Sequence, residues 1–163
     1  WKRGSWMKVY VASSWRNLKH KFVVTYLRDL GHEVYDFRHP YAGNEGFHWA
    51  EIDPQWKQWS TRQFIQALDS DIARNGFLAD VRALQDADAV VMVMPCGKSS
   101  HLELGWAAGA GKPTAILLDG SCKPELMYKL AGLITTNLLY IGRWLANQPL
   151  PFELERTRGS LQP

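Results

Sequence analysis

A near-continuous apolar run, Ala89-Val90-Val91-Met92-Val93-Met94, constrains the fold of this chain more than any other segment. Such a run, rich in β-branched residues and closed by Pro95, predicts a strand covered on both faces, as in parallel sheets flanked by helices. Residues 8–12, 33–37 and 113–118 have a similar short apolar character. Between the first two, residues 16–30 carry apolar side chains at helical spacing and Gly31 ends the pattern. This strand–helix–strand unit predicts a parallel pair with a right-handed crossover.

The alternation continues to the end of the chain. Helices are expected at 61–68, 77–85, 101–110 and 124–131, with Asn75-Gly76 as a break, and a short strand and last helix within 133–147. The pattern predicts an α/β fold: a doubly wound, mainly parallel sheet of about five strands with flanking helices, of the flavodoxin or Rossmann type. Ligands of such sheets bind at the carboxyl ends of the strands. The loops at 13–17 and 95–103 are therefore the expected site.

The length of 163 residues fits one domain, which we place at 7–147. Residues 1–6 precede Met7 and show no periodicity, so we interpret them as an expression remnant or a disordered tail. Residues 41–60 form a Trp-rich insert or lid, and residues 148–163 form a C-terminal tail rich in proline and charge.

Charge and cysteine usage exclude several classes. The net charge is +3, of which Lys2 and Arg3 supply two, so a nucleic-acid polymer is not expected as a partner. The two cysteines form no CxxC pair, and His39 and His48 lack further ligands at metal-binding spacing, so neither a metal nor a cofactor is expected. No apolar run spans a membrane and no signal peptide is seen, which predicts a cytoplasmic protein.

Glu103 is the main catalytic candidate. Ser100-x-x-Glu103 also matches a capping box, in which the glutamate would only bind the backbone of its own helix. The following residues, up to Gly111, are almost all alanine and glycine. Glycine costs a helix about 1 kcal/mol relative to alanine. A helix with so many glycines and alanines has almost no side chain on several faces, which suits close approach to a strand or ligand.

Two further side chains have ambiguous roles. Asp80 shares a predicted buried stripe with Phe77, Val81 and Leu84, so its carboxylate is either paired with Arg74 or Arg82, or catalytic. Tyr10 occupies the third position of the first strand, where it is either a core residue or a site residue whose hydroxyl needs a partner.

Both predicted site loops carry groups that suit an anion. A P-loop is excluded, because its first glycine would fall at Met92. What remains is a glycine- and serine-containing turn before a helix, where N–H groups and the helix dipole favour negative charge. The candidate phosphate- or substrate-binding residues are Ser13, Ser14, Arg16, Gly97, Lys98, Ser99 and Ser100; the alternative is a solvated turn with a helix cap.

The insert combines aromatic and acidic residues. Phe47, Trp49 and Trp56 are candidates for stacking on a flat base, as a lid. The alternative is a satellite hydrophobic cluster or a subunit contact.

Taken together, these segments resemble the nucleoside 2-deoxyribosyltransferase superfamily, including its nucleoside 5′-monophosphate N-glycosidases. The resemblance rests on the strand at 9–13, on Asp80 ahead of the segment 87–91, and on Ser100-x-x-Glu103-Leu104-Gly105 with Gly111-Lys112-Pro113. It covers roughly residues 7–118. It implies that Glu103 is the nucleophile on the anomeric carbon, that Tyr10 positions this carboxylate, and that Asp80 contacts the base or assists its departure. It also implies a homodimer or larger assembly.

The chain departs from the transferases in the loop before Glu103. Their Pro-Asp-Ser-Gly-Thr-like stretch holds the base through its aspartate, whereas residues 95–100 here contain none. The expected function is therefore cleavage of the N-glycosidic bond of a nucleoside or its 5′-monophosphate, with hydrolysis favoured over base transfer. A 2-deoxyribosyltransferase, a non-catalytic nucleotide-binding sensor and an NAD glycohydrolase are the alternatives.

Overall fold

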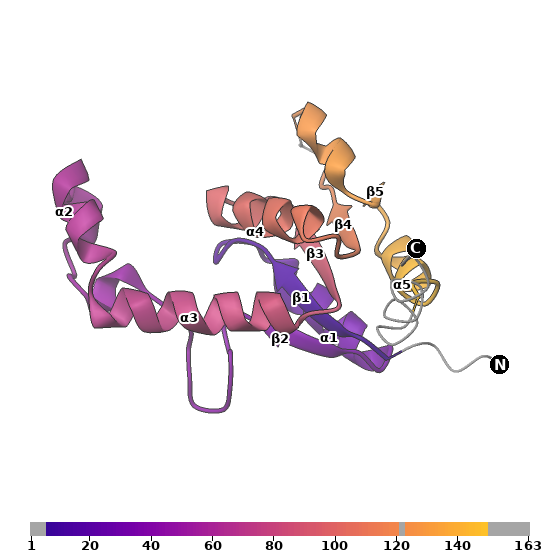
Figure 1. The fold of residues 1–163 in the computed structure, drawn as a ribbon, viewed down its shortest axis with the longest axis horizontal. Helices are drawn as coiled ribbons and strands as arrows, with labels where there is room; N and C mark the ends of the chain where they lie inside the picture. The colour runs from indigo at the N-terminus through magenta and orange to yellow at the C-terminus, as the bar shows by residue number, and fades with distance from the viewer. Residues whose placement is uncertain (1–5, 121–122, 150–163) are drawn as a thin grey trace, which may run out of the picture. The chain divides into compact units, whose positions relative to one another are not determined.

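The structure is a computed structural model that describes residues 6–120 and 123–149; the predicted tails at 1–5 and 150–163 lie outside this part. The described residues form two compact units. The first comprises residues 6–35 and 87–149 and contains the sheet (Figure 1). The second comprises residues 36–86, and each unit is described by itself.

The first unit is built on a five-stranded sheet with strand order β2-β1-β3-β4-β5. The strands are β1 (Lys8–Ala12), β2 (Glu33–Asp36), β3 (Ala89–Val93), β4 (Thr114–Leu117) and β5 (Leu133–Thr135). β3 pairs in parallel with β1 and β4, and β4 with β5; the register sets Tyr10 opposite Val90. The part of the predicted apolar run that forms the central strand, Ala89–Val93, is completely buried, and Met94 just after it is half-buried. The predicted α/β sheet is thus confirmed.

Helices cover both faces of this sheet (Figure 1). Alternate side chains of the strands, such as Val9, Val11 and Val91, pack with α1 (His20–Asp29) and α5 (Leu138–Leu145) in one core. The intervening residues, including Tyr10, point to the other face. There α4 (Lys98–Gly109) contacts β1, β3 and β4. The fold is doubly wound, as predicted.

The close approach of α1 and α5 depends on a glycine. A Cβ built at Gly142 of α5 would lie 2.6 Å from the Tyr26 hydroxyl and 2.8 Å from Leu30 Cδ1. A side chain at this position would require the ends of the Tyr26 and Leu30 side chains to move.

Several predicted helix boundaries move. The first helix begins at His20 rather than at residue 16, because Asn17 uses its side chain to join two loops. α4 begins at Lys98, three residues earlier than expected, and the predicted helix at 124–131 is the 3₁₀ segment η3 (Leu126–Leu130).

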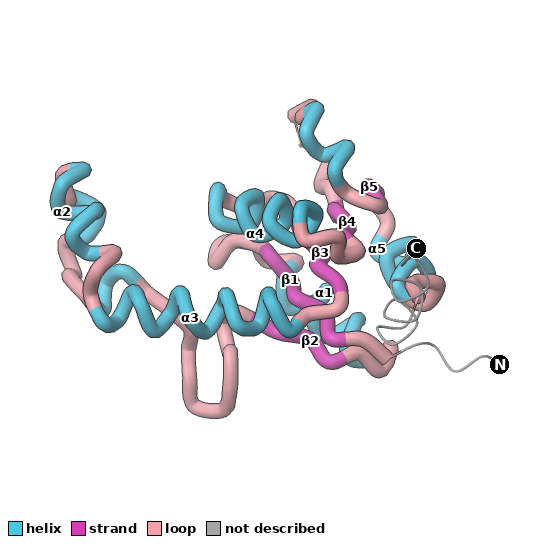
Figure 2. Tube along the Cα trace, in the orientation of Figure 1, coloured by secondary structure: helices cyan, strands magenta, loops and turns pink. Residues whose placement is uncertain are grey.

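The second unit contains two 3₁₀ turns, η1 (Trp49–Glu51) and η2 (Trp56–Gln58), followed by α2 (Thr61–Ala67) and α3 (Asp71–Asp86). Figure 2 shows that loops dominate the chain ahead of α2. The predicted break at Asn75-Gly76 is wrong, since α3 runs through it. Gly76 instead permits a close contact, because a Cβ there would lie 2.9 Å from Phe47 Cβ.

The predicted buried stripe on α3 is also wrong in part. Phe77 is 66% exposed, whereas Leu84 at the far end is 6% exposed.

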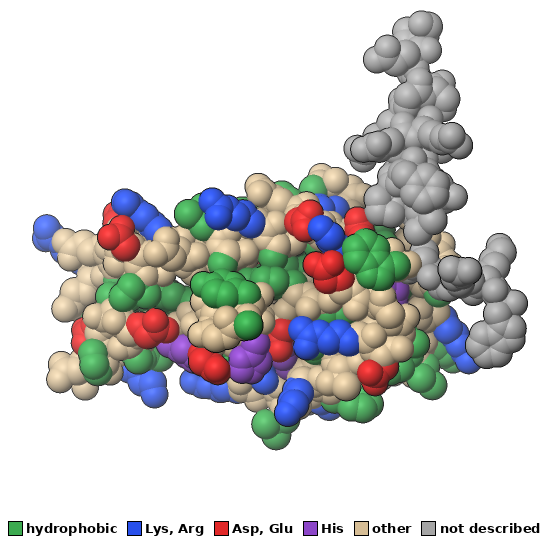
Figure 3. Space-filling model, turned by 90° about the horizontal axis from the view of Figure 1, so that it is seen from below, with side chains coloured by type: hydrophobic (Ala, Val, Ile, Leu, Met, Phe, Trp, Pro, Cys, Tyr) green, Lys and Arg blue, Asp and Glu red, His purple; other side chains and the backbone are tan. Residues whose placement is uncertain are grey.

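The surface carries intermixed charges: Figure 3 shows basic and acidic side chains side by side on the face in view, with no extended patch of one sign.

Candidate functional site

The strand order places the topological switch between β1 and β3. The connection from β1 leads to a helix on one face, and the connection from β3 leads to α4 on the other. In sheets of this order, a crevice forms at the carboxyl ends of these two strands. Ser13 directly follows β1, and residues 94–97 directly follow β3. The two loops selected from the sequence therefore begin at the switch point.

A hydrogen-bond network joins the two loops. Asn17 is 2% exposed, and its Nδ2 donates to Ser13 Oγ (3.0 Å), to the Val93 carbonyl (3.1 Å) and to the Pro95 carbonyl (3.2 Å). Ser13 Oγ also donates to the Val93 carbonyl, at 2.9 Å. Buried amides of this kind rigidify a site when their bonds are satisfied. Asn17 thus holds the end of β1 against the end of β3.

Ser100 adds a bond in the opposite direction. Its hydroxyl, in a residue 1% exposed, donates to the Ser13 carbonyl at 3.0 Å. The N-cap of α4 is Gly97, in extended geometry and without a side-chain cap, so Ser100 lies inside the first turn. The capping-box alternative for Ser100 and Glu103 is therefore wrong. The physical reason is that the helix starts at Lys98, which makes Ser100 its third residue, and that the Ser100 hydroxyl donates to the Ser13 carbonyl just after β1.

The start of α4 carries groups of the kind that would suit an anion. The first N–H groups of an α-helix have no carbonyl partner within the helix, and the dipole adds positive character there. Lys98 and Ser99 are exposed at this end. Across the switch point Arg16 is exposed as well, and Ser14 Oγ accepts from the Arg16 backbone N–H at 3.2 Å.

Glu103 and Tyr10 both belong to the sheet unit. Glu103 is half-buried on α4, between the exposed Leu102 and the buried Leu104. Tyr10 is 1% exposed, lies on the sheet face that α4 covers, and stacks on Tyr35 with ring centroids 5.2 Å apart. This accounts for the ring of Tyr10 as a core residue.

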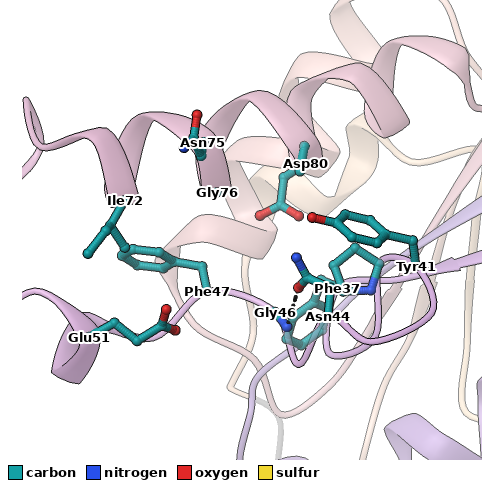
Figure 4. Close-up of a pocket in the computed structure, with 12 residues that line it drawn as sticks. Phe37, Tyr41, Asn44, Gly46, Phe47, Glu51, Ile72, Asn75, Gly76 and Asp80 are labelled. Atoms are coloured by element: carbon teal, nitrogen blue, oxygen red, sulfur yellow. Dashed lines mark hydrogen bonds between the residues drawn. The ribbon is translucent and has the colours of Figure 1, made fainter.

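Asp80 and Phe47 line a pocket within the second unit (Figure 4). Its volume is about 280 Å³, and in the close-up the Asp80 carboxylate points into the space beside Tyr41. Glu51 also lines it, although Glu51 Oε1 accepts from the His48 backbone N–H. The lining residues are Phe37, Pro40, Tyr41, Asn44, Gly46, Phe47, Glu51, Ile72, Asn75, Gly76, Ala79 and Asp80.

The tryptophans of the insert have a different position. Trp49 makes edge contacts with Phe47, Trp59 and Phe64, with centroids 4.7 to 5.8 Å apart. Neither Trp49 nor Trp56 is among the residues that line the pocket. Trp49 thus lies at the centre of an aromatic cluster, and the role of Trp49 and Trp56 as a lid stays a prediction.

Asp53 is an unsuitable proton donor. The backbone N–H of Gln55 and then the Trp59 indole N–H, at 2.8 and 2.6 Å, hold the pKa of the Asp53 carboxyl below its usual value. Both bonds favour the carboxylate, so Asp53 stays ionised and braces the insert.

Two residues beside the candidate site were not singled out from the sequence. His101 Nδ1 lies 2.8 Å from the Gly97 carbonyl, and His101 Nε2 lies 2.9 Å from the Tyr128 hydroxyl. His101 lies within the loop at 95–103, so the sequence had already indicated this region. Tyr128 is 27 residues away, and no local pattern connects it to the loop.

The described residues offer neither a metal site nor a membrane-spanning helix. Within residues 6–120 and 123–149, no three His, Cys, Asp or Glu side chains gather in a way that could hold a metal ion. None of the helices in that part of the chain is long and apolar enough to cross a membrane.

The fold resembles that of a characterised enzyme. A solved structure of a 2-deoxyribosyltransferase from Bacillus psychrosaccharolyticus is 20% identical, with a TM-score of 0.53, over 87% of this chain and 92% of that chain. The CMP N-glycosidase of Clostridium botulinum is 16% identical, with a TM-score of 0.46, over 85% of this chain and 97% of that chain. The sequence matches no protein-family model and no curated protein. The first likeness confirms the fold that the sequence resemblance implied.

Proposed function

We propose that this protein hydrolyses the N-glycosidic bond of a nucleoside 5′-monophosphate, with the Glu103 carboxylate as the nucleophile. The observation that carries the proposal is the arrangement at the switch point. The Asn17 and Ser100 bonds tie the end of β1 to the first turn of α4, and Glu103 follows on the same helix.

The spacing along α4 suits a nucleotide. A phosphate bound at the Lys98 end would meet N–H groups and the exposed Lys98, Ser99 and Arg16 side chains. Glu103 lies five residues further along the helix, or about 7.5 Å at a rise of about 1.5 Å per residue. A nucleoside 5′-monophosphate has a comparable span between its phosphate and its anomeric carbon.

The chemistry follows from the transition state. Breaking the bond between C1′ and the base nitrogen leaves positive charge on the sugar, and a carboxylate stabilises this charge or bonds to C1′. The base departs with the bond's electron pair and takes a proton from a general acid, the role that the family resemblance offers to Asp80. Water then attacks C1′ and returns a proton to that carboxylate, which releases the sugar phosphate and restores both Glu103 and the acid.

Fold likeness to a 2-deoxyribosyltransferase favours transfer as the second candidate. In that reaction a second base, in place of water, attacks C1′ of the glycosyl-enzyme. The loop before Glu103 argues for water, because residues 95–100 carry no aspartate to hold an acceptor base.

The test is a base-release assay on nucleosides, their monophosphates and NAD, with and without an acceptor base. We expect monophosphates to react fastest, and Glu103→Gln to lower the rate by at least about a thousandfold, as losses of a covalent nucleophile do. Glu33→Gln, at an exposed position of β2, is the matched control. Unchanged base release in Glu103→Gln would refute the mechanism. Equal nucleotide binding by both proteins without base release would indicate a sensor, and nicotinamide release from NAD would indicate a glycohydrolase.

A further inference from the structure

The pocket of the second unit is opened by one face of α3. Positions 72, 75, 76, 79 and 80 line it, and they recur at the spacing of a single helix face. Gly76 and Ala79 lie in the middle of this face and have almost no side chain. The hollow therefore forms between Ile72 and Asp80, and the Asp80 carboxylate is directed into it (Figure 4).

Phe47 forms a flat and fixed wall of this pocket. A Cβ built at Gly76 would lie 2.9 Å from Phe47 Cβ, so the Phe47 side chain packs directly on the helix. The Trp49 ring meets the Phe47 ring edge-on, with centroids 4.7 Å apart. A ring held by two neighbours keeps its orientation without a ligand, and such a ring suits stacking of a planar group. The wall therefore favours an aromatic ligand.

Asn44 supplies a hydrogen-bond donor whose direction is known. The Gly46 backbone N–H can only donate, so the Asn44 amide atom 2.7 Å from it is Oδ1. The amide nitrogen Nδ2 then lies on the opposite side, and Figure 4 shows it turned toward the Asp80 carboxylate. Nδ2 can donate but cannot accept. A ligand at this end of the pocket meets a fixed donor from Asn44 next to the carboxyl group of Asp80.

The charge of the lining disfavours an anion. Of the described residues around the pocket, none is lysine, arginine or histidine, whereas Glu51 and Asp80 are acidic. Tyr41 is the only other titratable group among them, and the positions of α3 three and four residues from Asp80 carry no charge. The volume of about 280 Å³ is below the roughly 300–1,000 Å³ of pockets for drug-sized ligands. A neutral, planar ligand of one or two rings fits these properties, and a phosphate does not.

We propose that this pocket binds the base of the substrate and that Asp80 and Asn44 select cytosine. The inference rests on the proposed function, because it takes the planar ligand to be a nucleobase. One edge of cytosine carries in order an amino donor, the acceptor N3 and the acceptor O2. One oxygen of a protonated Asp80 accepts from the amino group and its hydroxyl donates to N3, while Asn44 Nδ2 donates to O2.

The contact with N3 needs one proton between Asp80 and the base. N3 and an ionised carboxylate both offer lone pairs, so cytosine binds as a pair that has taken up a proton from solution. The same proton serves the reaction. As the bond to C1′ breaks, its electron pair stays with the base, the proton moves from Asp80 to N3, and Asp80 is left as a carboxylate.

The other common bases fit this end of the pocket less well. Uracil has a carbonyl oxygen in place of the amino group, and this oxygen is far less basic than N3, so it does not share the proton. An ionised Asp80 would also place one of its oxygens against that carbonyl. Adenine has the amino group and a ring acceptor, but it has no acceptor for Asn44 Nδ2. Guanine has the reverse order, one acceptor followed by two donors. Because unmatched polar groups lower affinity, we expect cytosine to bind best.

The experiment measures the binding of free cytosine, uracil and adenine to the whole protein by titration calorimetry, in buffers with different enthalpies of ionisation. We expect cytosine to take up about one proton near neutral pH and to bind more tightly as the pH falls. Uracil and adenine should bind about tenfold more weakly, the effect of one lost hydrogen bond, and uracil without proton uptake. Equal binding of cytosine and uracil, cytosine binding without proton uptake, or no binding of cytosine would overturn the inference.

Two variants assign the proton to its carboxyl group. Asp80→Asn places an amide against the amino group and N3, so cytosine should still bind within about fivefold of wild type, but without proton uptake. Glu51→Gln is the matched control, because Glu51 is the other acid of the lining and the substitution keeps the oxygen that accepts from the His48 N–H. It should retain the proton uptake. Uptake that persists in Asp80→Asn, or is lost in Glu51→Gln, would overturn the role of Asp80.

A third variant tests the Asn44 donor. Asn44→Asp keeps an oxygen for the Gly46 N–H and replaces the donor Nδ2 by an acceptor. We expect the dissociation constant of cytosine to rise about tenfold or more and that of adenine to stay within about twofold, because adenine does not use this donor. Equal changes for both bases would overturn the role of Asn44. This comparison remains decisive if Asp80→Asn does not fold.

The inference and the proposed function can fail separately. If cytosine binds with proton uptake but no nucleotide loses its base, the proposed function fails and the assignment of the pocket stands. If cytosine, uracil and adenine nucleotides are hydrolysed with similar kcat/KM and cytosine binds without proton uptake, hydrolysis stands and the selection by Asp80 and Asn44 fails.

Discussion

His32 lies between α1 and β2 with 8% of its surface exposed. Its Nδ1 is buried without a hydrogen-bond partner among the described residues. Burial disfavours the imidazolium and lowers the pKa of His32 below its ordinary value of 6.5. The folded protein therefore binds fewer protons at this residue than the unfolded chain.

The sign of the resulting pH dependence follows directly. The contribution of neutral His32 to stability is complete above pH 6.5, the ordinary pKa, and decreases as the pH falls from there towards the lowered pKa. We predict that the free energy of unfolding, measured in urea, falls less between pH 8 and mildly acidic pH in His32→Leu than in the wild type. The exposed His39→Gln is the control and should show the same loss as wild type. A His32→Leu curve parallel to wild type over this range would contradict the prediction.

The Ser100 hydroxyl gives a second prediction at the scale of single residues. Ser100→Ala leaves the Ser13 carbonyl without the bond it accepts at 3.0 Å. Because a buried carbonyl that loses its donor costs about 1–3 kcal/mol, we expect a loss of stability in that range on chemical denaturation. The exposed neighbour Ser99→Ala should change stability by less than about 0.5 kcal/mol. Equal effects of the two substitutions would show that the cross-loop bond contributes nothing.

At the scale of elements, α3 shows how tertiary packing overrides a local signal. Asn75-Gly76 reads as a helix break, yet the helix continues because Phe47 from the insert packs where a side chain of residue 76 would stand. Gly76 therefore leaves room for the Phe47 side chain and does not end the helix. Phe47 and Gly76 are 29 residues apart and belong to separate segments of the second unit, so no local sequence cue could have indicated this contact.

Gly76→Ala and Gly105→Ala should therefore have opposite effects. Both glycines lie inside helices, where alanine is intrinsically better by about 1 kcal/mol. A Cβ at Gly76 would meet Phe47 at 2.9 Å, so we expect a lower melting temperature. A Cβ at Gly105 of α4 meets nothing within 4 Å, so we expect an unchanged or higher one. If Gly76→Ala stabilises the protein as Gly105→Ala does, Phe47 does not constrain α3.

At the scale of the whole molecule, α4 has more apolar surface than one sheet face can cover. Leu104 and Ala107 are buried in the sheet unit, whereas Leu102 is 75% and Trp106 is 44% exposed. Leu102 and Trp106 are four residues apart and lie on one face of the helix. An exposed apolar stripe of this kind is typical of a protein contact.

We predict that the protein is a homodimer or larger and that this stripe contributes to the contact. Leu102→Glu with Trp106→Glu should shift the mass measured by light scattering to that of one chain, because two charges would enter an apolar interface. Leu139→Glu, at a position of α5 that is 54% exposed, is the control and should leave the mass unchanged. A wild-type protein that is already monomeric at high concentration would contradict the prediction.

The sequence by itself determined the architecture. Strand and helix periodicity depend on neighbours in the chain, so β1, β3, β4 and the alternation that makes a doubly wound sheet could be predicted. The same reasoning placed Ser13 and Gly97 at the ends of the two strands that flank the switch.

Only the tertiary structure decided how individual side chains are used. The Ser100 hydroxyl bonds to a carbonyl 87 residues away. The Asn17 amide nitrogen bonds to one 76 residues away, while its oxygen accepts locally from the Lys19 backbone N–H. Tyr128 reaches His101 across 27 residues. Such bonds depend on distances between segments that are remote in sequence, and one sequence without its fold contains no measure of those distances.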